Sequence, residues 1–315
     1  MAVTATGFFD GVHTGHRAVI GRLVREASAR GEDSVVVTFN PHPRAVLQKG
    51  APQLRLLTSH QEKCELLLSL GVTRVETLPF TREFAKMTAD SYIRELLAGR
   101  FGASALVFGY DNRIGSDGAG IAEVSSIVSA LGIDLVKCDA VGDISSTKIR
   151  HCLENGDVDR ANEMLGYDYF LNGVVVEGQK IGRTLGFPTA NLQVFEPLKL
   201  IPANGVYLVK VELPALYSDS RALYGMCNIG SRPTVNTGSD ITIETNIFDF
   251  DEQIYGLPMK ISILKRLRGE TRFSSTATLR DQLQSDLSAC RALLSLCHSQ
   301  HLLNFGIYFH FVPIF

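Results

Sequence analysis

Two histidines near the amino terminus, His13 and His16, lie in a glycine-containing segment, GFFDGVHTGH (residues 7–16), which follows a short apolar stretch. In a helix that begins within this segment they would lie about one turn apart. Imidazoles there can donate hydrogen bonds to phosphate oxygens and respond to the negative charge of a transition state. Gly11 and Gly15 would let backbone amides approach a phosphate, and a helix amino terminus adds unpaired N–H donors. The segment therefore predicts a phosphate-binding site.

Two other interpretations of the histidine pair stay open. One is a zinc site, although zinc usually takes three or more protein ligands and no third candidate is close in the sequence. The other is a pair of structural histidines at a helix cap.

Three further segments carry residues suited to a polyphosphate. SSTKIR (residues 145–150) places hydroxyl groups at a predicted helix start and follows them with two cations; its alternative is a helix cap with ordinary surface charges. GYDNRIG (residues 109–115) is a glycine-flanked turn after a predicted strand. NPHP (residues 40–43) ends a strand in a rigid turn that would wall the same crevice, and the alternative for His42 is a structural role.

A second glycine-rich segment, GQKIGRTLGFPTAN (residues 178–191), lies in the other half of the chain. With Gly182 and Gly186 it reads as a mobile flap that closes over a nucleotide and excludes water. Thr189 and Asn191 offer hard oxygen ligands suited to magnesium and the phosphates it bridges. The alternative is a long hairpin turn.

One carboxylate, Glu244, lies among β-branched neighbours in IETNIFDF (residues 243–250). Phosphorylation of an alcohol needs little covalent chemistry from a protein, but a base on the attacking hydroxyl helps. Glu244 is the candidate base, and its alternative is a solvated glutamate at a strand edge.

The elements that must position these residues differ between the two halves of the chain. In the first half, apolar β-branched runs alternate with amphipathic stretches, which predicts a parallel sheet with crossover helices. From about residue 169, alternating runs separated by turn residues predict an antiparallel sheet or small barrel, and a boundary is expected near residues 166–170. Strands are expected over residues 2–6, 35–39, 105–108, 173–177, 206–213, 241–248 and 259–264, and helices over residues 18–29, 62–70, 147–153, 158–165 and 279–296.

Composition narrows the class of protein. The 315 residues are enough for two domains, and the formal net charge of −2 gives no general reason to expect nucleic acid or an acidic membrane as partner. The six cysteines form no CxxC pair, and neither a secretory signal nor a membrane-spanning run is expected, so a cytoplasmic protein is the expectation. Residues 297–315 crowd five aromatic side chains near the end and show no helical or strand period.

The ordered set GFFDGVHTGH, TFNPHP, LPFTREFA, GYDNRIG and SSTKIR resembles the nucleotidyltransferase half of prokaryotic bifunctional riboflavin kinase/FAD synthetases. The later set GRTLGFPTAN, IPANGVY, NIGSRPT, IETNIFDF, RLRGETRF and LRDQLQSD resembles the riboflavin kinase module of the same family, in order and spacing. Together the two resemblances cover nearly the whole chain.

This resemblance implies a Rossmann-like α/β nucleotidyltransferase domain over residues 1–166. A small antiparallel Greek-key β-barrel with a C-terminal helix would follow over residues 167–296, with an atypical aromatic tail over 297–315. The implied activity is ATP-dependent phosphorylation of riboflavin to FMN, followed by adenylylation of FMN to FAD with release of pyrophosphate. The implied ligands are riboflavin, FMN, FAD and ATP, with Mg²⁺ as the metal cofactor.

The resemblance also implies residue roles in each domain. In the adenylyltransferase, His13 and His16 would be catalytic, and ATP and its phosphates would contact Gly7, Phe9, Asp10, Gly11, Gly15, Ser146, Thr147 and Arg150. Asn40, His42 and Asp111 would lie at the crevice for flavin and nucleotide. In the kinase, Glu244 would activate the 5′-hydroxyl of riboflavin, Gly182, Gly186, Thr189 and Asn191 would bind Mg-ATP with Thr189 and Asn191 on the metal, and Arg268 and Glu270 would contact the flavin.

Two other functions remain compatible with the sequence. Asn112 and Ile114 stand in a turn where relatives often carry bulkier or aromatic residues, which raises the hypothesis of a riboflavin kinase whose N-terminal domain is weak or inactive. The other hypothesis is a flavin-binding sensor without catalysis. The sequence does not indicate an oligomeric state.

Overall fold

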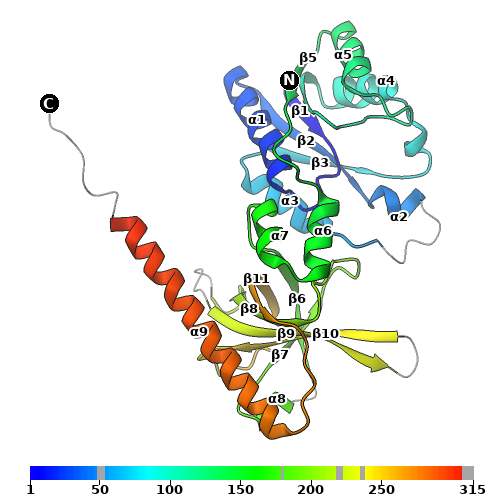
Figure 1. Cartoon of the computed structure of the whole chain (residues 1–315). Helices are drawn as coiled ribbons and strands as arrows, with labels where there is room; N and C mark the ends of the chain where they lie inside the picture. Colours follow the sequence, from blue (N-terminus) through cyan, green and yellow to red (C-terminus); the bar gives the residue numbers. More distant parts are fainter. Residues whose placement is uncertain (48–53, 179–180, 218–222, 235–237, 307–315) are drawn as a thin grey trace, which may run out of the picture. The chain divides into compact units, whose positions relative to one another are not determined.

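The computed structural model describes residues 1–47, 54–178, 181–217, 223–234 and 238–306, and it divides into two compact units (Figure 1). Unit 1 contains residues 1–151, 163–167 and 198–200. Unit 2 contains residues 152–162, 168–197 and the chain from residue 201 onward. Within the described residues, no helix is both long enough and apolar enough to span a bilayer.

Unit 1 is built on a five-stranded parallel sheet with the order β3-β2-β1-β4-β5. Because β1 lies between β2 and β4, the chain reverses its winding direction there, and ligands of such sheets bind at the carboxyl ends of the strands beside that point. The strands are β1 (Ala2–Thr6), β2 (Asp33–Asn40), β3 (Arg74–Pro79), β4 (Ala103–Gly109) and β5 (Asp134–Cys138). The parallel α/β prediction is confirmed.

Helices bury both faces of this sheet, which explains the continuous apolar runs in its central strands. Successive residues of a strand point to opposite faces: Val36 packs with α1 and α3, and Val35 and Val37 pack with the η2 helix and α5. The helices and turns of unit 1 are α1 (Thr14–Arg30), α2 (Pro43–Leu47), α3 (His60–Ser69), η1 (Phe84–Lys86), α4 (Ala89–Ser91), the π-helix η2 (Tyr92–Arg100) and α5 (Ile121–Ala130). Two further helices, α6 (Ser146–Asn155) and α7 (Val158–Leu165), contain residues of both units.

Local signals set the ends of α1, the helix that carries the histidine pair. Its buried residues Ile20, Leu23 and Ala27 repeat at helical spacing and face the sheet. It ends at Gly31, which has a φ of +65° and donates its N–H to the carbonyl of Ser28. A side chain at this left-handed position would cost roughly 1 kcal/mol.

Unit 2 is a closed six-stranded barrel with the order β10-β7-β6-β11-β8-β9 and antiparallel pairing throughout. Its strands are β6 (Phe170–Val176), β7 (Ala190–Val194), β8 (Gly205–Glu212), β9 (Leu223–Thr234), β10 (Gly238–Ile247) and β11 (Pro258–Arg268). Helix α9 (Thr276–Gly306) lies along the barrel (Figure 1). Its leucines and Cys290 pack with barrel residues that include Val206 and Leu208. The predicted barrel with a C-terminal helix is confirmed.

One local prediction is wrong, and one segment contains a short helix that the sequence did not predict. The tail was expected to lack a helical period from residue 297, but α9 continues to Gly306, because neither proline nor glycine interrupts residues 276–305. Residues 307–315 lie outside the described part of the chain. Part of the glycine-rich segment after β6 is helical: the short helix α8 (Ile181–Thr184) forms there, and Phe187 donates its N–H to the carbonyl of Gly182 at 2.8 Å. The role of this segment as a mobile flap stays a prediction. Gln179 and Lys180 of the same segment lie outside the described residues.

Candidate active sites

The loop between β1 and α1 holds an unusual backbone conformation at the carboxyl end of the sheet. Phe9 and Val12 have φ values of 50° and 37°, and such left-handed geometry costs a non-glycine residue roughly 1–3 kcal/mol. Gly11, with a φ of 81°, lies so close to Leu57 that a Cβ would come within 2.7 Å of its Cδ1 atom. Strained backbone of this kind persists where the surrounding structure holds it, and it concentrates at functional sites.

The two histidines of this loop stack on each other, with ring centroids 3.6 Å apart. His13 is the N-cap of α1, and its Nδ1 accepts a hydrogen bond from the His16 backbone N–H at 3.3 Å. Because Nδ1 is an acceptor, a neutral His13 carries its proton on Nε2, where it can donate to a ligand. His16 Nδ1 is buried without a hydrogen-bond partner in the described structure. Buried polar atoms usually have such a partner, so this nitrogen could bond to a ligand.

Burial keeps both imidazoles neutral. It lowers the pKa of His13 to about 4, against the opposing attraction of Asp10 and Asp111. Burial, the neighbouring His13 and Lys63 hold the pKa of His16 well below its ordinary value. Neutral rings can donate hydrogen bonds without repelling a cation that accompanies a nucleotide, and a bound polyphosphate would raise both pKa values.

A pH dependence of stability follows from the His13 pKa. Its ordinary value is 6.5 and its folded value is about 4, so between these pH values the unfolded chain binds a proton that the folded chain does not. The free energy of unfolding should therefore fall as the pH is lowered from 6.5 to 4, by at most about 3 kcal/mol from this group. Denaturant unfolding at pH 7 and pH 4.5 measures the change.

His13→Asn is the matched control for this prediction. Asparagine keeps an N-cap acceptor for the His16 N–H but does not titrate, so the variant should lose less stability on acidification than the wild type. Equal losses in the two proteins would contradict the assignment of the pH dependence to His13.

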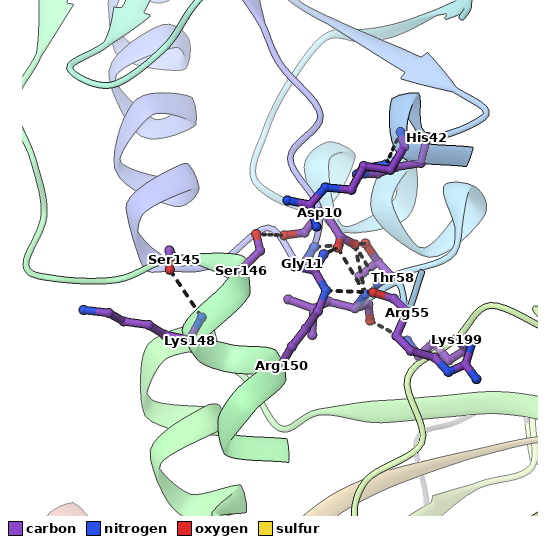
Figure 2. A network of polar contacts seen from close by, with 12 residues as sticks. Asp10, Gly11, His42, Arg55, Thr58, Ser145, Ser146, Lys148, Arg150 and Lys199 are labelled. Carbon is purple, nitrogen blue, oxygen red and sulfur yellow. Dashed lines mark hydrogen bonds and ion pairs between the residues drawn. The ribbon is translucent and has the colours of Figure 1, made fainter. Parts of the chain in front are cut away.

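The carboxylate of Asp10 is held by several hydrogen bonds and an ion pair (Figure 2). It accepts hydrogen bonds from the backbone N–H groups of Leu57 at 3.0 Å and Thr58 at 3.1 Å, and it forms a buried ion pair with Arg150 of α6. The hydroxyl of Ser146 donates to the backbone carbonyl of Asp10 at 2.9 Å. The β1–α1 loop and the amino-terminal turn of α6 are thereby fixed to each other.

These elements enclose a cavity of about 490 Å³ at the carboxyl ends of β1 and β4. Most of the predicted adenylyltransferase residues line it: Gly7, Phe9, Asp10, His13, Gly15, His16, His42, Asp111, Ser146, Thr147 and Arg150. Two predicted residues do not line it. Gly11 lies behind the wall, with its N–H donated to Thr58 Oγ1 at 3.1 Å, and Asn40 is the exposed last residue of β2.

His42 belongs to the same wall. Its Nδ1 accepts the backbone N–H of Arg44 at 3.2 Å, and its ring lies 5.4 Å from that of Phe8. Burial lowers the pKa of His42 to about 4. The ring is therefore a neutral, partly apolar surface at the cavity mouth.

An adjoining aromatic cavity of about 230 Å³ was missed by the sequence reasoning. It shares Phe8 and Asn112 with the larger cavity. Tyr92 also lines it, and the hydroxyl of Tyr92 is hydrogen-bonded to the hydroxyl of Thr6 at 2.7 Å. Its other aromatic walls are Phe39, Phe80 and Phe84. The signal was present in the LPFTREFA segment, where Phe80 and Phe84 follow a strand, but only the folded chain brings them against Phe39.

In unit 2, Glu244 of β10 lies directly opposite Asn191 of β7 in the antiparallel register. Both side chains are half-buried, and residues in this register share one face of the sheet. Gly178 approaches the Asn191 amide so closely that a Cβ would lie 2.2 Å from its Nδ2. The register therefore brings together two of the predicted kinase residues that are 53 positions apart in sequence (244 minus 191).

Thr189 lines a separate cavity of about 300 Å³, together with Arg183 and the 250–255 segment. The amide of Asn246 donates to the carbonyl of Pro188 at 2.7 Å and so fixes the residue before Thr189. Gly182 and Gly186 flank this wall: a Cβ on Gly182 would lie 2.3 Å from the carbonyl oxygen of Phe187, and Gly186 has a φ of 85°. Both positions require glycine.

Arg268 and Glu270, predicted flavin contacts, have protein partners in the structure. Arg268 makes a bidentate ion pair with the buried Asp286 of α9, at 2.8–3.1 Å. Glu270 accepts from the amide of Asn204 at 3.0 Å. The Arg268–Asp286 pair fastens α9 to β11, a role that the sequence did not reveal, and the flavin contact of these residues stays a prediction.

The two candidate sites, one in each unit, offer different metal ligands. Among the described residues, no group of three or more His, Cys, Asp or Glu side chains could hold a metal ion, so the zinc interpretation of His13 and His16 gains no third ligand there. The hydroxyl of Thr189, the amide of Asn191 and the carboxylate of Glu244 offer hard oxygen donors, which suit Mg²⁺.

Comparisons with known proteins cover both units. A family model described as FAD synthetase matches residues 1–151, and one described as riboflavin kinase matches residues 165–294. The chain is 35% identical over 291 residues to the bifunctional riboflavin kinase/FMN adenylyltransferase of Bacillus subtilis, covering 90% of each chain. It is 33% identical over 299 residues to the protein of the same name from Escherichia coli K12, covering 93% of each.

A solved structure shares the whole architecture. It is a Streptococcus pneumoniae chain described as a macrolide-efflux protein, with a TM-score of 0.85 and 32% identity, and the match covers 92% of this chain and 93% of that one.

Proposed function

This chain belongs to the family of bifunctional riboflavin kinase/FMN adenylyltransferases, and we propose that it makes FAD from riboflavin in two ATP-dependent steps. Phosphoryl transfer to riboflavin gives FMN, and adenylyl transfer to FMN gives FAD and pyrophosphate. The observation that carries the adenylyl step is the 490 Å³ cavity that joins the stacked histidines to the start of α6. The proposal assigns this step to residues 1–166 and the kinase step to residues 167–296.

In adenylyl transfer, an oxygen of the FMN phosphate attacks the α-phosphorus of ATP, and the bond to the β-phosphate oxygen breaks. The cavity supplies donors for the negative charge that moves onto the leaving pyrophosphate: Nε2–H of His13, the ring of His16 and the N–H groups at the start of α6. Arg150 adds a guanidinium group, and the ion pair with Asp10 fixes the orientation of that group. Asp10 is therefore proposed as a positioning residue, since its oxygens are already engaged by Leu57, Thr58 and Arg150.

The aromatic cavity is the proposed seat of the isoalloxazine ring. Its lining by phenylalanines and Tyr92 suits a flat, mostly apolar ring, and its shared wall with the larger cavity suits a flavin whose phosphate must meet ATP. Asn112, in the turn that motivated an inactive first domain, donates to the carbonyl of Thr6 at 3.0 Å and supports the shared wall. A kinase with an inactive first domain is accordingly not favoured.

In phosphoryl transfer, the 5′-hydroxyl of riboflavin attacks the γ-phosphorus of ATP and ADP leaves. The proposed role of Glu244 is to accept the proton of that hydroxyl, beside Asn191 on the same face of the barrel. Thr189 and Asn191 are the proposed ligands of Mg²⁺, which would neutralise phosphate charge when bound.

Separation of the flavins formed from riboflavin, ATP and MgCl₂ tests the proposal. FMN should appear first and FAD after it, and addition of excess EDTA should stop FMN formation because the ligands proposed for the kinase site suit Mg²⁺. FMN that never proceeds to FAD would refute the adenylyltransferase assignment. Undiminished FMN formation in EDTA would refute the metal assignment.

A further inference from the structure

A three-residue segment, Leu198–Leu200, belongs to unit 1 although it lies in sequence between the barrel strands β7 and β8. It pairs with Leu56 like a short strand: Leu56 donates its N–H to the carbonyl of Leu198 at 2.8 Å, and Leu200 donates to the carbonyl of Leu56 at 2.8 Å. Both main-chain polar groups of Leu56 are thereby occupied. The residues on either side of Leu56 are held in register with it.

Those flanking residues are bonded to Asp10 and Arg150, which line the 490 Å³ cavity, called the phosphate cavity below. Figure 2 shows Arg55 beside Arg150 in this network. The carbonyl of Arg55 accepts from Nε of Arg150 at 2.7 Å, and the N–H of Leu57 donates to Asp10 at 3.0 Å. Both members of the Asp10–Arg150 ion pair are thus bonded to the main chain of residues 55–57. A displacement of that main chain would turn the Arg150 guanidinium.

Lys199 holds the main chain of residues 55–57 through the carbonyl of Leu57. Its side chain is 2% exposed, and Nζ donates to the carbonyl of Leu57 at 2.8 Å and to Glu62 Oε2 at 2.6 Å. Glu62 also accepts the N–H of Ser59 at 2.8 Å in the capping box that starts α3. Leu57 is therefore held through its carbonyl by Lys199 and through its N–H by Asp10.

Stability alone is a poor explanation for this buried pair. Replacing both members of a buried ion pair by well-packed hydrophobic residues of similar volume is often neutral or stabilising, because the charges of the pair must leave water on folding. A buried pair can instead define a unique geometry, and the geometry defined here is that of residues 55–58 behind Arg150.

We propose that Lys199 is a positioning residue for adenylyl transfer. Its hydrogen bond to the Leu57 carbonyl fixes the position of the main chain at residues 55–57, and this main chain orients Asp10 and Arg150 toward the phosphate cavity. The proposal rests on the adenylyltransferase function assigned to that cavity. It predicts an effect on turnover more than on substrate affinity, because Arg150 is needed most where charge develops.

Lys199→Met in the full-length chain is the first test. With FMN and ATP as substrates, kcat for FAD formation should fall on the order of 10- to 100-fold, as for a small misplacement of a catalytic group, while KM for FMN changes less than about threefold. FMN formation from riboflavin should be unchanged. A normal kcat for FAD formation would overturn the proposal.

The double variant Glu62→Gln/Lys199→Met separates positioning from charge balance. It removes the unpaired buried carboxylate, so its thermal midpoint should return toward that of the wild type, yet kcat should stay low because the Leu57 carbonyl still lacks its Nζ donor. Recovery of kcat in the double variant would overturn the proposal, and the double variant carries the test if Lys199→Met does not fold.

Arg30→Met is the matched control, since it removes ion pairs to Glu26 and Asp134 that lie outside this network. It should leave FAD formation at the wild-type rate; a loss equal to that of Lys199→Met would show a general effect of ion-pair removal and overturn the specific role. Failure of the wild type itself to form FAD would refute the proposed function instead, so the two failures are distinguishable.

Discussion

Replacing Glu244 by glutamine is expected to lower kcat for FMN formation by about 10²- to 10⁴-fold, the usual contribution of a general base. Glutamine keeps the shape of the side chain opposite Asn191 but cannot accept the proton of the riboflavin hydroxyl. FAD formation from supplied FMN should stay at the wild-type rate. Steady-state kinetics with riboflavin and with FMN as separate substrates measure both effects.

Glu212→Gln is the matched control for Glu244→Gln. Glu212 lies on β8 and pairs with Lys260 at 3.3 Å, and among the described strands β8 pairs with neither β10 nor β7, the strands that carry Glu244 and Asn191. Its neutralisation should leave FMN formation unchanged. A Glu244→Gln enzyme with normal FMN formation, or one that loses only FAD formation, would contradict the assignment of Glu244 as the kinase base.

His16→Ala is expected to lower kcat for FAD formation by about 10²- to 10³-fold, comparable to the loss of one preorganised donor to a developing negative charge. The variant removes the ring that stacks on His13 and lines the 490 Å³ cavity. FMN formation from riboflavin should continue at the wild-type rate. The reaction should therefore stop at FMN, which separation of the flavins detects directly.

His151→Ala controls for the loss of a histidine, because His151 is exposed on α6 and does not line the cavity. Its FAD formation should match that of the wild type. Thermal unfolding of His16→Ala distinguishes a catalytic loss from a folding defect, since the variant should remain folded at the assay temperature. Normal FAD formation by folded His16→Ala would contradict the role given to this ring.

The spacing of apolar residues predicted most helices and strands, because the residues that bury each of these elements lie within the element itself. The β-branched run at residues 35–37 is buried on both faces of a parallel sheet, and α9 packs against the barrel through Leu283, Leu287, Leu293 and Leu294. The expectation for residues 297–306 was wrong because a helix already formed before residue 297 continues through residues 297–305, which contain neither proline nor glycine, even where the sequence shows no apolar period. The helical turn at residues 181–184 was missed since four residues carry too little period to detect.

The candidate sites were predictable where chemistry and local structure coincide. The histidine pair and SSTKIR each lie at a helix start, and the sheet topology brings both to one cavity. Contacts between distant segments were not predictable. The bond from Lys199 to Leu57 joins residues 142 positions apart, and neither residue type indicates the pairing.

The central claim, that one chain uses two ATP molecules at two sites, is tested most directly by following the phosphorus atoms. Riboflavin is incubated with Mg²⁺ and ATP labelled with ³²P in either the γ or the α position, and FMN and FAD are isolated. The γ-label should enter FMN and persist in the FMN half of FAD, whereas the α-label should enter only the AMP half of FAD. FAD that lacks α-label, or FMN that lacks γ-label, would contradict it.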